Sequence, residues 1–322
     1  MSVRVESVRH TGAAGRAGAV RILDLRATAA RPLPRFAAGS HVDVQIGAEL
    51  VRQYSLLNDP AEDGRYLIAV ALDAGSLGGS RYLHEHVRVG DELQIGAPRC
   101  LFPLVEEAPH SVLIAGGIGV TPLWSMAQRL LSLGRSFSFH FGARSAATAP
   151  LLHDLEQRLR PAGITLETVF EDDAGARLDL PSIIAAAPSG SHFYACGPSA
   201  MLEAYLLAAR EAGRPDTHVH LERFAASGIA REPAGGFIVA LERTGVSYAV
   251  PRGATILETL KANGINVPHS CAEGICGACE ATVLEGIPDH RDEVLSAAER
   301  ASNRTIMVCC SGAKTPRLVL DL

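Results

Sequence analysis

The sequence predicts a multi-domain protein in which a small antiparallel β-barrel, an α/β doubly wound domain and an α+β domain follow one another. The length of 322 residues corresponds to two to three domains of about 150 residues each. Short strands separated by turn residues fill the first hundred positions, whereas strands and longer helices alternate from Ser111 onward. Five of the seven cysteines lie in the last fifth of the chain, which marks a third region.

The barrel is expected over residues 1–105. Several short strands at this spacing are typical of a small antiparallel barrel. A short helix, Arg81 to Val87, follows Gly78-Gly79-Ser80 and ends before Gly90. The expected strands are Ala19 to Ala27, His41 to Ile46, Arg52 to Leu57, Tyr66 to Leu72 and Glu92 to Ile95.

The α/β domain is expected over residues 106–225. Val112 to Ala115 reads as a fully buried strand, and the alternation of strands with helices that follows indicates parallel βαβ units. Helices are expected at Leu123 to Leu133, Leu151 to Leu159 and Ala200 to Ala212, with further strands at Ser136 to Phe141, Thr165 to Phe170 and His192 to Ala195.

A linker is expected over residues 226–236, because this stretch is rich in Ala, Ser, Gly and Pro. The third domain then covers residues 237–322. Its expected elements are strands Phe237 to Leu241 and Ser247 to Val250, a helix Ile256 to Asn263, a cysteine loop, and strands Ala281 to Leu284 and Thr305 to Cys310.

Composition excludes several classes of protein. With 47% hydrophobic and 20% charged residues, the chain can form packed cores and is not mainly disordered. The formal net charge is -5 and no basic tract occurs, so nucleic acid is not expected as a partner. The apolar runs are strand-sized and the first ten residues lack the apolar region of a signal peptide. We therefore expect no membrane association and a cytoplasmic location.

The clustered cysteines indicate an iron–sulfur centre. Cys271, Cys276 and Cys279 form a C-x4-C-x2-C pattern, and Cys309 follows 30 positions later. This is the ligand spacing of a plant-type [2Fe-2S] cluster. Gly274 and Gly277 suit a backbone that folds closely over an inorganic core. Structural zinc is the alternative, although zinc sites more often use two C-x2-C pairs or histidines.

The fourth ligand is left open between Cys309 and Cys310 by spacing alone. If both lie on a strand, their side chains point to opposite faces and only one can bind iron. The other is then expected to be a buried thiol that packs as a small hydrophobic residue.

The cysteine region, its ending Met307-Val308-Cys309-Cys310-Ser311 and the Asp289-His290-Arg291-Asp292 loop resemble phthalate dioxygenase reductase and its relatives, including vanillate O-demethylase reductases. The resemblance covers the whole chain. It implies that Cys309 is the fourth ligand, that the third domain is a plant-type ferredoxin of the β-grasp kind, and that flavin, nucleotide and ferredoxin domains follow in that order.

A flavin site is expected on the barrel. Arg52, Tyr54 and Ser55 form an R-x-Y-S motif, in which alternation places Arg52 and Tyr54 on one face and Ser55 starts the next turn. An arginine can pair with phosphate, an aromatic ring can pack on the flavin and a hydroxyl can bind a ring nitrogen. Without a family match, the motif would read as an ordinary half-exposed strand. Gly79 and Ser80 open a helix whose first turn suits a phosphate.

The resemblance assigns the flavin to Arg52, Tyr54, Ser55, Gly79 and Ser80, and we add Val70 to the expected flavin-binding set. It favours FMN, with FAD as the alternative. Glu222-Arg223-Phe224 resembles the family's terminal E-x-F, whose aromatic ring covers the flavin. Without that resemblance, Phe224 would be assigned to the core.

A pyridine-nucleotide site is expected at Gly116-Gly117-Ile118-Gly119-Val120-Thr121-Pro122, directly after a buried strand. Thr121 suits an N-cap and Pro122 a first helical position, so the loop leads to a helix amino terminus that favours pyrophosphate. The third glycine of G-x-G-x-x-G is absent. Cys196, Gly197 and Pro198 end another strand, at the sheet edge where such folds bind ligands. The resemblance places them beside the nicotinamide, whereas a plain buried thiol would look similar.

The expected function is electron transfer from a pyridine nucleotide through flavin to the [2Fe-2S] cluster, with Ser55, Thr121, Cys196 and Phe224 nearest the chemistry. The resemblance alone favours NADH as that nucleotide. The resemblance implies that a Rieske non-haem iron oxygenase, acting on an aromatic carboxylate or methoxyaromatic compound, receives the electrons. Alternatives are an FAD-dependent reductase of another oxygenase and a redox-sensing module. Arg144 after a strand leaves NADPH open. His84, His86, His269 and His290 are expected to be solvated or capping residues.

Overall fold

The computed structural model describes residues 1–11, 19–28, 32–47, 50–73, 78–225 and 236–322. The chain divides into two compact units, Met1–Arg223 and Phe224–Leu322. The expected linker, residues 226–236, lies outside the described residues except for Gly236. Among the helices of the described ranges, none has the length and apolar character that crossing a membrane requires.

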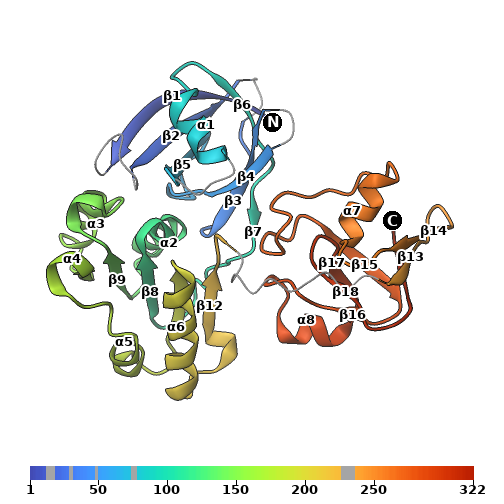
Figure 1. The fold of residues 1–322 in the computed structure, drawn as a ribbon. Coiled ribbons are helices and arrows are strands. Elements are labelled where there is room, and N and C mark those ends of the chain that lie inside the picture. Colours follow the sequence, from blue (N-terminus) through green and yellow to red (C-terminus); the bar gives the residue numbers. More distant parts are fainter. Residues whose placement is uncertain (12–18, 29–31, 48–49, 74–77, 226–235) are drawn as a thin grey trace. The chain divides into compact units, whose positions relative to one another are not determined.

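The first unit begins with a closed antiparallel barrel (Figure 1). Two sheets, ordered β5-β2-β1-β6 and β4-β3-β7, are joined at their edges by the bridges Val44–Ile95 and Leu56–Ile68. Alternate residues such as Val42 and Val44 point inward and are fully buried. The strands are β1 (Ser2–Thr11), β2 (Val20–Ala27), β3 (Ser40–Ile46), β4 (Leu50–Ser55), β5 (Arg65–Ala71), β6 (Glu92–Gln94) and β7 (Arg99–Cys100).

Helix α1 (Gly79–Glu85) caps the barrel and is anchored at its C-terminal end. The buried Arg21 of β2 donates hydrogen bonds to the carbonyl groups of Leu83, His84 and Val87. These carbonyls have no partner within the helix, so the guanidinium satisfies them and fixes the helix on the barrel. At the other end, Gly78 is left-handed with φ 96°, which lets the chain enter the helix without a side-chain cap.

The α/β part of the first unit is a five-stranded parallel sheet ordered β10-β9-β8-β11-β12. Its order reverses between β8 and β11, which is the topological switch point where such sheets bind ligands. The strands are β8 (Ser111–Gly116), β9 (Phe137–Ala143), β10 (Thr165–Phe170), β11 (His192–Cys196) and β12 (Val219–Glu222).

Helices cover both faces of this sheet (Figure 1). Leu113 and Ala115 of β8 pack with α2, whereas Val112 and Ile114 pack with α5 and α6, as strand alternation requires. The helices are α2 (Val120–Ser132), α3 (Leu152–Leu159), α4 (Glu171–Ala174), α5 (Leu180–Ala186) and α6 (Ser199–Glu211), with 3-10 turns η1 (Gly117–Gly119), η2 (Ala146–Thr148) and η3 (Asp216–His218).

The barrel and the sheet share one core. Ile22 and Leu57 of the barrel pack in the same cluster as Leu123 of α2. Polar contacts reinforce this junction, because Ser125 of α2 donates to the Asn58 carbonyl at 3.0 Å and Gln128 donates to the Leu57 carbonyl at 2.8 Å. These buried bonds fix the residues that follow β4 against α2, which is the helix that follows β8 at the switch point.

The second unit is an α+β fold built on a mixed sheet ordered β14-β13-β19-β15-β17. Helix α7 packs Ile256 and Leu260 against the sheet, and its capping box joins Thr255 to Glu258. A ribbon of β16 and β18 lies beside it. The elements are β13 (Phe237–Leu241), β14 (Val246–Val250), α7 (Ile256–Ala262), β15 (Glu280–Glu285), β16 (Pro288–Asp289), α8 (Ala297–Ser302), β17 (Thr305–Met307), β18 (Gly312–Ala313) and β19 (Arg317–Leu320).

Three expectations about element ends are wrong, and so is the expectation that His290 is solvated, because its side chain is only 7% exposed. Thr121 does not cap α2: the helix begins at Val120 after η1, and the Thr121 hydroxyl donates to the Ile118 carbonyl at 3.0 Å instead. Ser55 does not start a turn, because it remains in β4 opposite His41. The strand expected to reach Cys310 ends at Met307, and residues 308–310 form a turn in which the Cys310 and Ser311 amides donate to the Met307 carbonyl. The opposite-face argument for the two cysteines therefore does not apply.

Candidate functional site

The two halves of the expected flavin-phosphate site lie together on the barrel. A Cβ atom on Gly79 would lie 2.9 Å from Cγ of Arg52, so the first turn of α1 packs directly on the arginine stem. The Ser80 hydroxyl accepts from the Asp73 amide at 3.3 Å. A guanidinium beside a glycine-opened helical turn fits a phosphate group. Binding by Arg52, Gly79 and Ser80 remains a prediction.

The other expected flavin residues are spread over the first unit and the start of the second. Tyr54 packs half-buried against the barrel core, and burial raises the pKa of its hydroxyl. Val70 is fully buried in that core, and its carbonyl lies 2.8 Å from Nε2 of His84. Phe224 opens the second unit and is 44% exposed. Their contacts with flavin stay predictions.

A buried polar group lies where the barrel meets the sheet. Ser55 at the end of β4 interacts with the carboxyl group of Glu222, which is the β12 partner of Cys196. Burial, opposed in part by Ser55, raises the pKa of Glu222 to about 8. Within the described residues, Ser55 Oγ and Glu222 Oε2 are out of solvent contact and make no hydrogen bond of normal geometry. Such orphaned buried groups fit a polar ring that approaches them and supplies the missing hydrogen bonds.

Sequence reasoning missed two members of this group. The sequence places Glu222 only within the E-x-F motif, and no motif includes Cys100. Burial is the main cause that raises the pKa of the Cys100 thiol, and the Glu222 carboxylate adds to it. Burial likewise raises the pKa of Cys196, whose side chain is fully buried. Both thiols are therefore neutral and cannot serve as nucleophiles.

Glu222 gives a testable pH dependence of stability. In the folded protein Glu222 keeps its proton up to about pH 8, whereas a glutamate of the unfolded chain loses its proton near about pH 4.3. The stability that neutral Glu222 contributes is therefore fully present below the unfolded pKa and is lost as the pH rises through the folded pKa. We expect the melting temperature of the as-purified protein, relative to that of Glu222→Gln, to fall by several degrees between pH 5 and pH 9. Thermal unfolding by circular dichroism at each pH measures it.

Glu203→Gln is the matched control. Glu203 lies on α6 in the same α/β region, pairs with Arg223 at 2.7 Å and is 61% exposed, so its removal is expected to leave the pH trend unchanged. An equal pH trend in the wild type and in Glu222→Gln would show that Glu222 is not held neutral.

The expected nucleotide loop lies at the switch point, against the loop after β11. A Cβ on Gly119 would lie 2.2 Å from the Cys196 carbonyl oxygen, and one on Gly116 would lie 2.7 Å from Cδ of Pro198. The two loops therefore touch backbone to backbone, which only glycine permits. Gly197 belongs to the same contact, because its Cβ would lie 2.9 Å from Cα of Gly116.

Gly117 differs from its neighbours. Its φ is +52° and a Cβ there would meet nothing within 4 Å, so it faces open space. It opens the 3-10 turn η1 (Gly117–Gly119), which leads directly into the 13-residue helix α2. An open glycine at a helix amino terminus fits the approach of a pyrophosphate to backbone N–H groups. The structure thus brings Gly116, Gly117, Gly119, Cys196, Gly197 and Pro198 together, and their binding of NADH remains a prediction.

The four predicted cysteine ligands form two pairs in the second unit. The thiols of Cys271 and Cys276 contact each other, as do those of Cys279 and Cys309. Over the described ranges, no three His, Cys, Asp or Glu side chains converge on one ion. Two thiolates per iron fit a two-iron cluster, whereas structural zinc needs four donors around one ion. The ligand set remains a prediction.

The loop around these cysteines is suited to anionic sulfur. The Glu273 amide donates to Cys271 Sγ at 3.3 Å. The neighbouring Cys276 thiol, together with backbone N–H groups, lowers the pKa of Cys271 to about 6, which favours the thiolate. Ala272 and Gly274 have positive φ angles of 58° and 77°, so the loop curls tightly and turns its amides inward.

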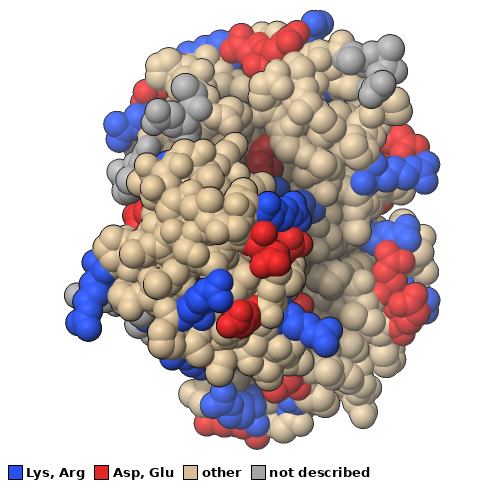
Figure 2. Space-filling model, turned by 90° about the vertical axis from the view of Figure 1, so that its right-hand side faces the viewer, with Lys and Arg blue, Asp and Glu red and all other residues tan. Residues whose placement is uncertain are grey.

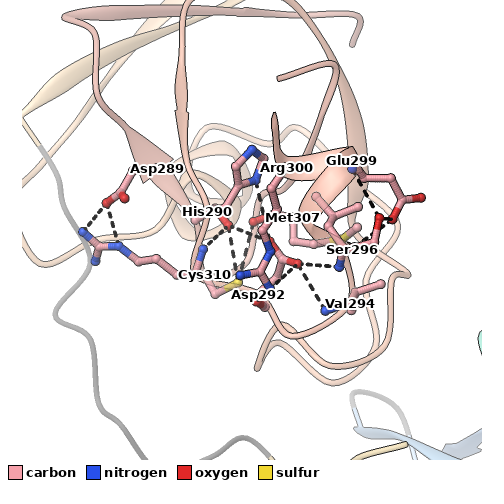
Figure 3. Close-up of polar contacts among 12 residues, drawn as sticks. Asp289, His290, Asp292, Val294, Ser296, Glu299, Arg300, Met307 and Cys310 are labelled. Carbon is pink, nitrogen blue, oxygen red and sulfur yellow. Dashed lines mark hydrogen bonds and ion pairs between the residues drawn. The ribbon is translucent and has the colours of Figure 1, made fainter. Parts of the chain in front are cut away.

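The loop of residues 289–295 supports the cysteine loop, and Figure 3 shows the polar contacts within it. The Glu293 amide donates to the Gly274 carbonyl at 2.8 Å. Asp292 is buried and accepts from the amides of Val294 and Leu295 at 3.1 and 2.8 Å. Arg300 of α8 donates to the Asp292 backbone carbonyl and lies 3.7 Å from its carboxylate. These bonds give the 289–295 loop a fixed shape on which Gly274 rests.

The fold and site define a class: a reductase with a flavin barrel, a nucleotide-binding α/β sheet and a [2Fe-2S] ferredoxin domain. Residues 239–314 match the family model described as "2Fe-2S iron-sulfur cluster binding domain". The chain is 50% identical to phenoxybenzoate dioxygenase subunit beta of Ectopseudomonas oleovorans, over 94% of this chain and 93% of that one. It is 48% identical to tetrachlorobenzoquinone reductase of Sphingobium chlorophenolicum, over 90% of each chain.

Among solved structures, phthalate dioxygenase reductase, described as a modular structure for electron transfer from pyridine nucleotides to [2Fe-2S], aligns with a TM-score of 0.71 and 34% identity, covering 100% of this chain and 98% of that one. The chain belongs to this family of oxygenase reductases. It is an oxidoreductase with a [2Fe-2S] cluster domain and serves an oxygenase system. The predicted family, three-part fold class and [2Fe-2S] cluster are confirmed, whereas the choice of FMN and of NADH stays a prediction.

Proposed function

We propose that this chain passes electrons to a separate Rieske non-haem iron oxygenase that acts on an aromatic carboxylate or methoxyaromatic compound. The observation that carries the proposal is that one chain holds two candidate redox sites. The first unit contains the Gly116–Gly119 loop and the Ser55–Glu222 contact, and the second unit contains two thiol pairs in a ferredoxin fold. The relative of 50% identity is named as a subunit of phenoxybenzoate dioxygenase, which supports an aromatic substrate for the partner. A cytoplasmic location stays a prediction.

A bound FMN would supply the conversion between two-electron transfer from NADH and one-electron transfer to the [2Fe-2S] cluster. The protein then has to bind and orient. We assign Arg52 with Gly79 and Ser80 to the flavin phosphate, and the Gly116–Gly119 loop to the pyrophosphate of NADH. Neutral Glu222 and Ser55 offer hydrogen bonds to the flavin ring without placing a charge beside it. Cys196, which is fully buried, would shape the nicotinamide site from beneath as a small neutral residue.

The surface charge suits a protein partner. Lys and Arg alternate with Asp and Glu on the face shown in Figure 2, with no extended area of one sign. Mixed charge of this kind favours a specific, transient contact over binding to a polyanion. The net charge of -5 agrees with this.

An anaerobic titration with NADH tests the electron path. We expect the flavin absorbance to bleach and the EPR signal of a reduced [2Fe-2S] cluster to grow in parallel. A protein that dithionite reduces but NADH does not would contradict the nucleotide site. Acid release of the flavin and its mass distinguish FMN from FAD, and the ratio of kcat/KM for NADH and NADPH tests the role of Arg144.

A second candidate activity is quinone reduction, because the 48% identical relative is named tetrachlorobenzoquinone reductase. It would use electrons at the flavin, so it does not need the cluster. NADH oxidation with a halogenated benzoquinone would distinguish the two: an activity that survives loss of the cluster, and that exceeds the rate with cytochrome c, would favour this candidate.

A further inference from the structure

Two neighbouring cysteines lie on the same side of the turn that follows β17. The Cys310 and Ser311 amides donate to the Met307 carbonyl at 3.4 and 3.0 Å, which closes the turn. The thiol of Cys309 contacts the Cys279 thiol and also the Cys310 thiol. The fifth cysteine of this region is therefore next to the sulfur proposed as the fourth ligand.

Cys310 also touches the cysteine loop. A Cβ on Gly274, which lies between Cys271 and Cys276, would be 2.5 Å from Cys310 Sγ. Figure 3 shows the Cys310 sulfur beside Asp292 and the 289–295 loop. The Cys310 thiol is half-buried, and its contacts with the Met307 carbonyl and the Ser311 hydroxyl are both 3.8 Å long. These long contacts hold the thiol weakly, so it can change its direction at little cost.

We propose that Cys310 is a reserve ligand of the [2Fe-2S] cluster, which replaces Cys309 on the iron that Cys279 binds. The inference rests on the proposed function and its ligand set. In the exchange, the iron–sulfur bond to Cys309 breaks, the bond to Cys310 forms, and the Cys310 proton moves to the Cys309 sulfur, or to solvent water when that sulfur is missing. No electron is gained or lost. The cluster thereby survives damage to Cys309.

Cys309→Ala in the full-length protein tests the proposal, with Cys279→Ala as the matched control. Each change removes one thiolate from the same predicted iron, but only Cys309 has a spare thiol beside it. We expect Cys309→Ala to keep at least half of the wild-type iron and sulfide and a [2Fe-2S] absorption spectrum. We expect Cys279→Ala and the double variant Cys309→Ala/Cys310→Ala to lose tenfold or more.

Two results would overturn the proposal. In the first, the Cys309→Ala protein loses its iron as completely as Cys279→Ala is expected to. In the second, the Cys279→Ala protein keeps as much iron as Cys309→Ala is expected to keep. If alanine at 309 prevents folding, Cys309→Ser keeps the side-chain size, and adding Cys310→Ala should then change its resonance Raman spectrum. An unchanged spectrum would exclude a Cys310–iron bond. A wild-type protein without a [2Fe-2S] signal would instead contradict the proposed function, so the two failures are distinguishable.

Discussion

Replacing Gly119 with alanine is expected to lower the rate at which NADH reduces the flavin by at least a hundredfold, equivalent to about 2.7 kcal/mol in kcat/KM. The added Cβ would lie 2.2 Å from the Cys196 carbonyl oxygen and 2.7 Å from the Gly197 nitrogen, both of which are backbone atoms. They cannot rotate away, so the two loops at the switch point must separate. Stopped-flow bleaching of the flavin under anaerobic conditions measures the effect.

Gly163→Ala is the control for Gly119→Ala. Gly163 lies in the same α/β region with φ +70°, and a Cβ there would meet nothing within 4 Å. Alanine at this position introduces backbone strain only, so we expect a slightly less stable protein with the wild-type rate of bleaching. Dithionite should reduce both variants fully. A Gly119→Ala protein that NADH reduces within threefold of the wild-type rate would show that the contact between the loops does not position the nucleotide.

The strongly patterned elements of the fold could be predicted from sequence, and the weakly patterned ones could not. Strand β8 is a run of buried residues, and the expected Val112 to Ala115 lies within it. Strand β1 was missed, because only Val3 and Val5 are buried within its first five residues. Edge strand β12 and the short helices α5 and α8 were also missed, since tertiary packing rather than periodicity holds such short elements.

The candidate site shows the same division. The glycines of 116–119 and the four cysteines could be predicted from the sequence because each set forms a motif of fixed spacing. The Ser55–Glu222 contact could not be predicted from the sequence, since it depends on how β4 of the barrel packs against β12 of the sheet. The cysteine pairing also needed the structure. A strand was expected through Cys310, whereas the turn after Met307 places the Cys309 and Cys310 thiols in contact.

Replacing Cys276 with alanine is expected to abolish cluster assembly and to reduce NADH-dependent reduction of cytochrome c more than a hundredfold. Cys276 is 2% exposed and its thiol contacts that of Cys271, so its loss leaves one iron of the predicted cluster with a single thiolate. Cys310, the spare thiol, contacts Cys309 of the other pair, so we do not expect it to compensate. Iron content, EPR and the cytochrome c rate measure the change.

The flavin half of the molecule provides the internal control for Cys276→Ala. Cys276 belongs to the second unit, whereas the barrel and the parallel sheet form the first. Reduction of ferricyanide by NADH needs only the flavin, so we expect it to stay within twofold of the wild-type rate while cytochrome c reduction disappears. Cys310→Ala should leave both rates unchanged. Equal loss of both rates in Cys276→Ala would mean that the cluster supports the fold of the whole chain, and undiminished cytochrome c reduction would mean that electrons leave directly from the flavin.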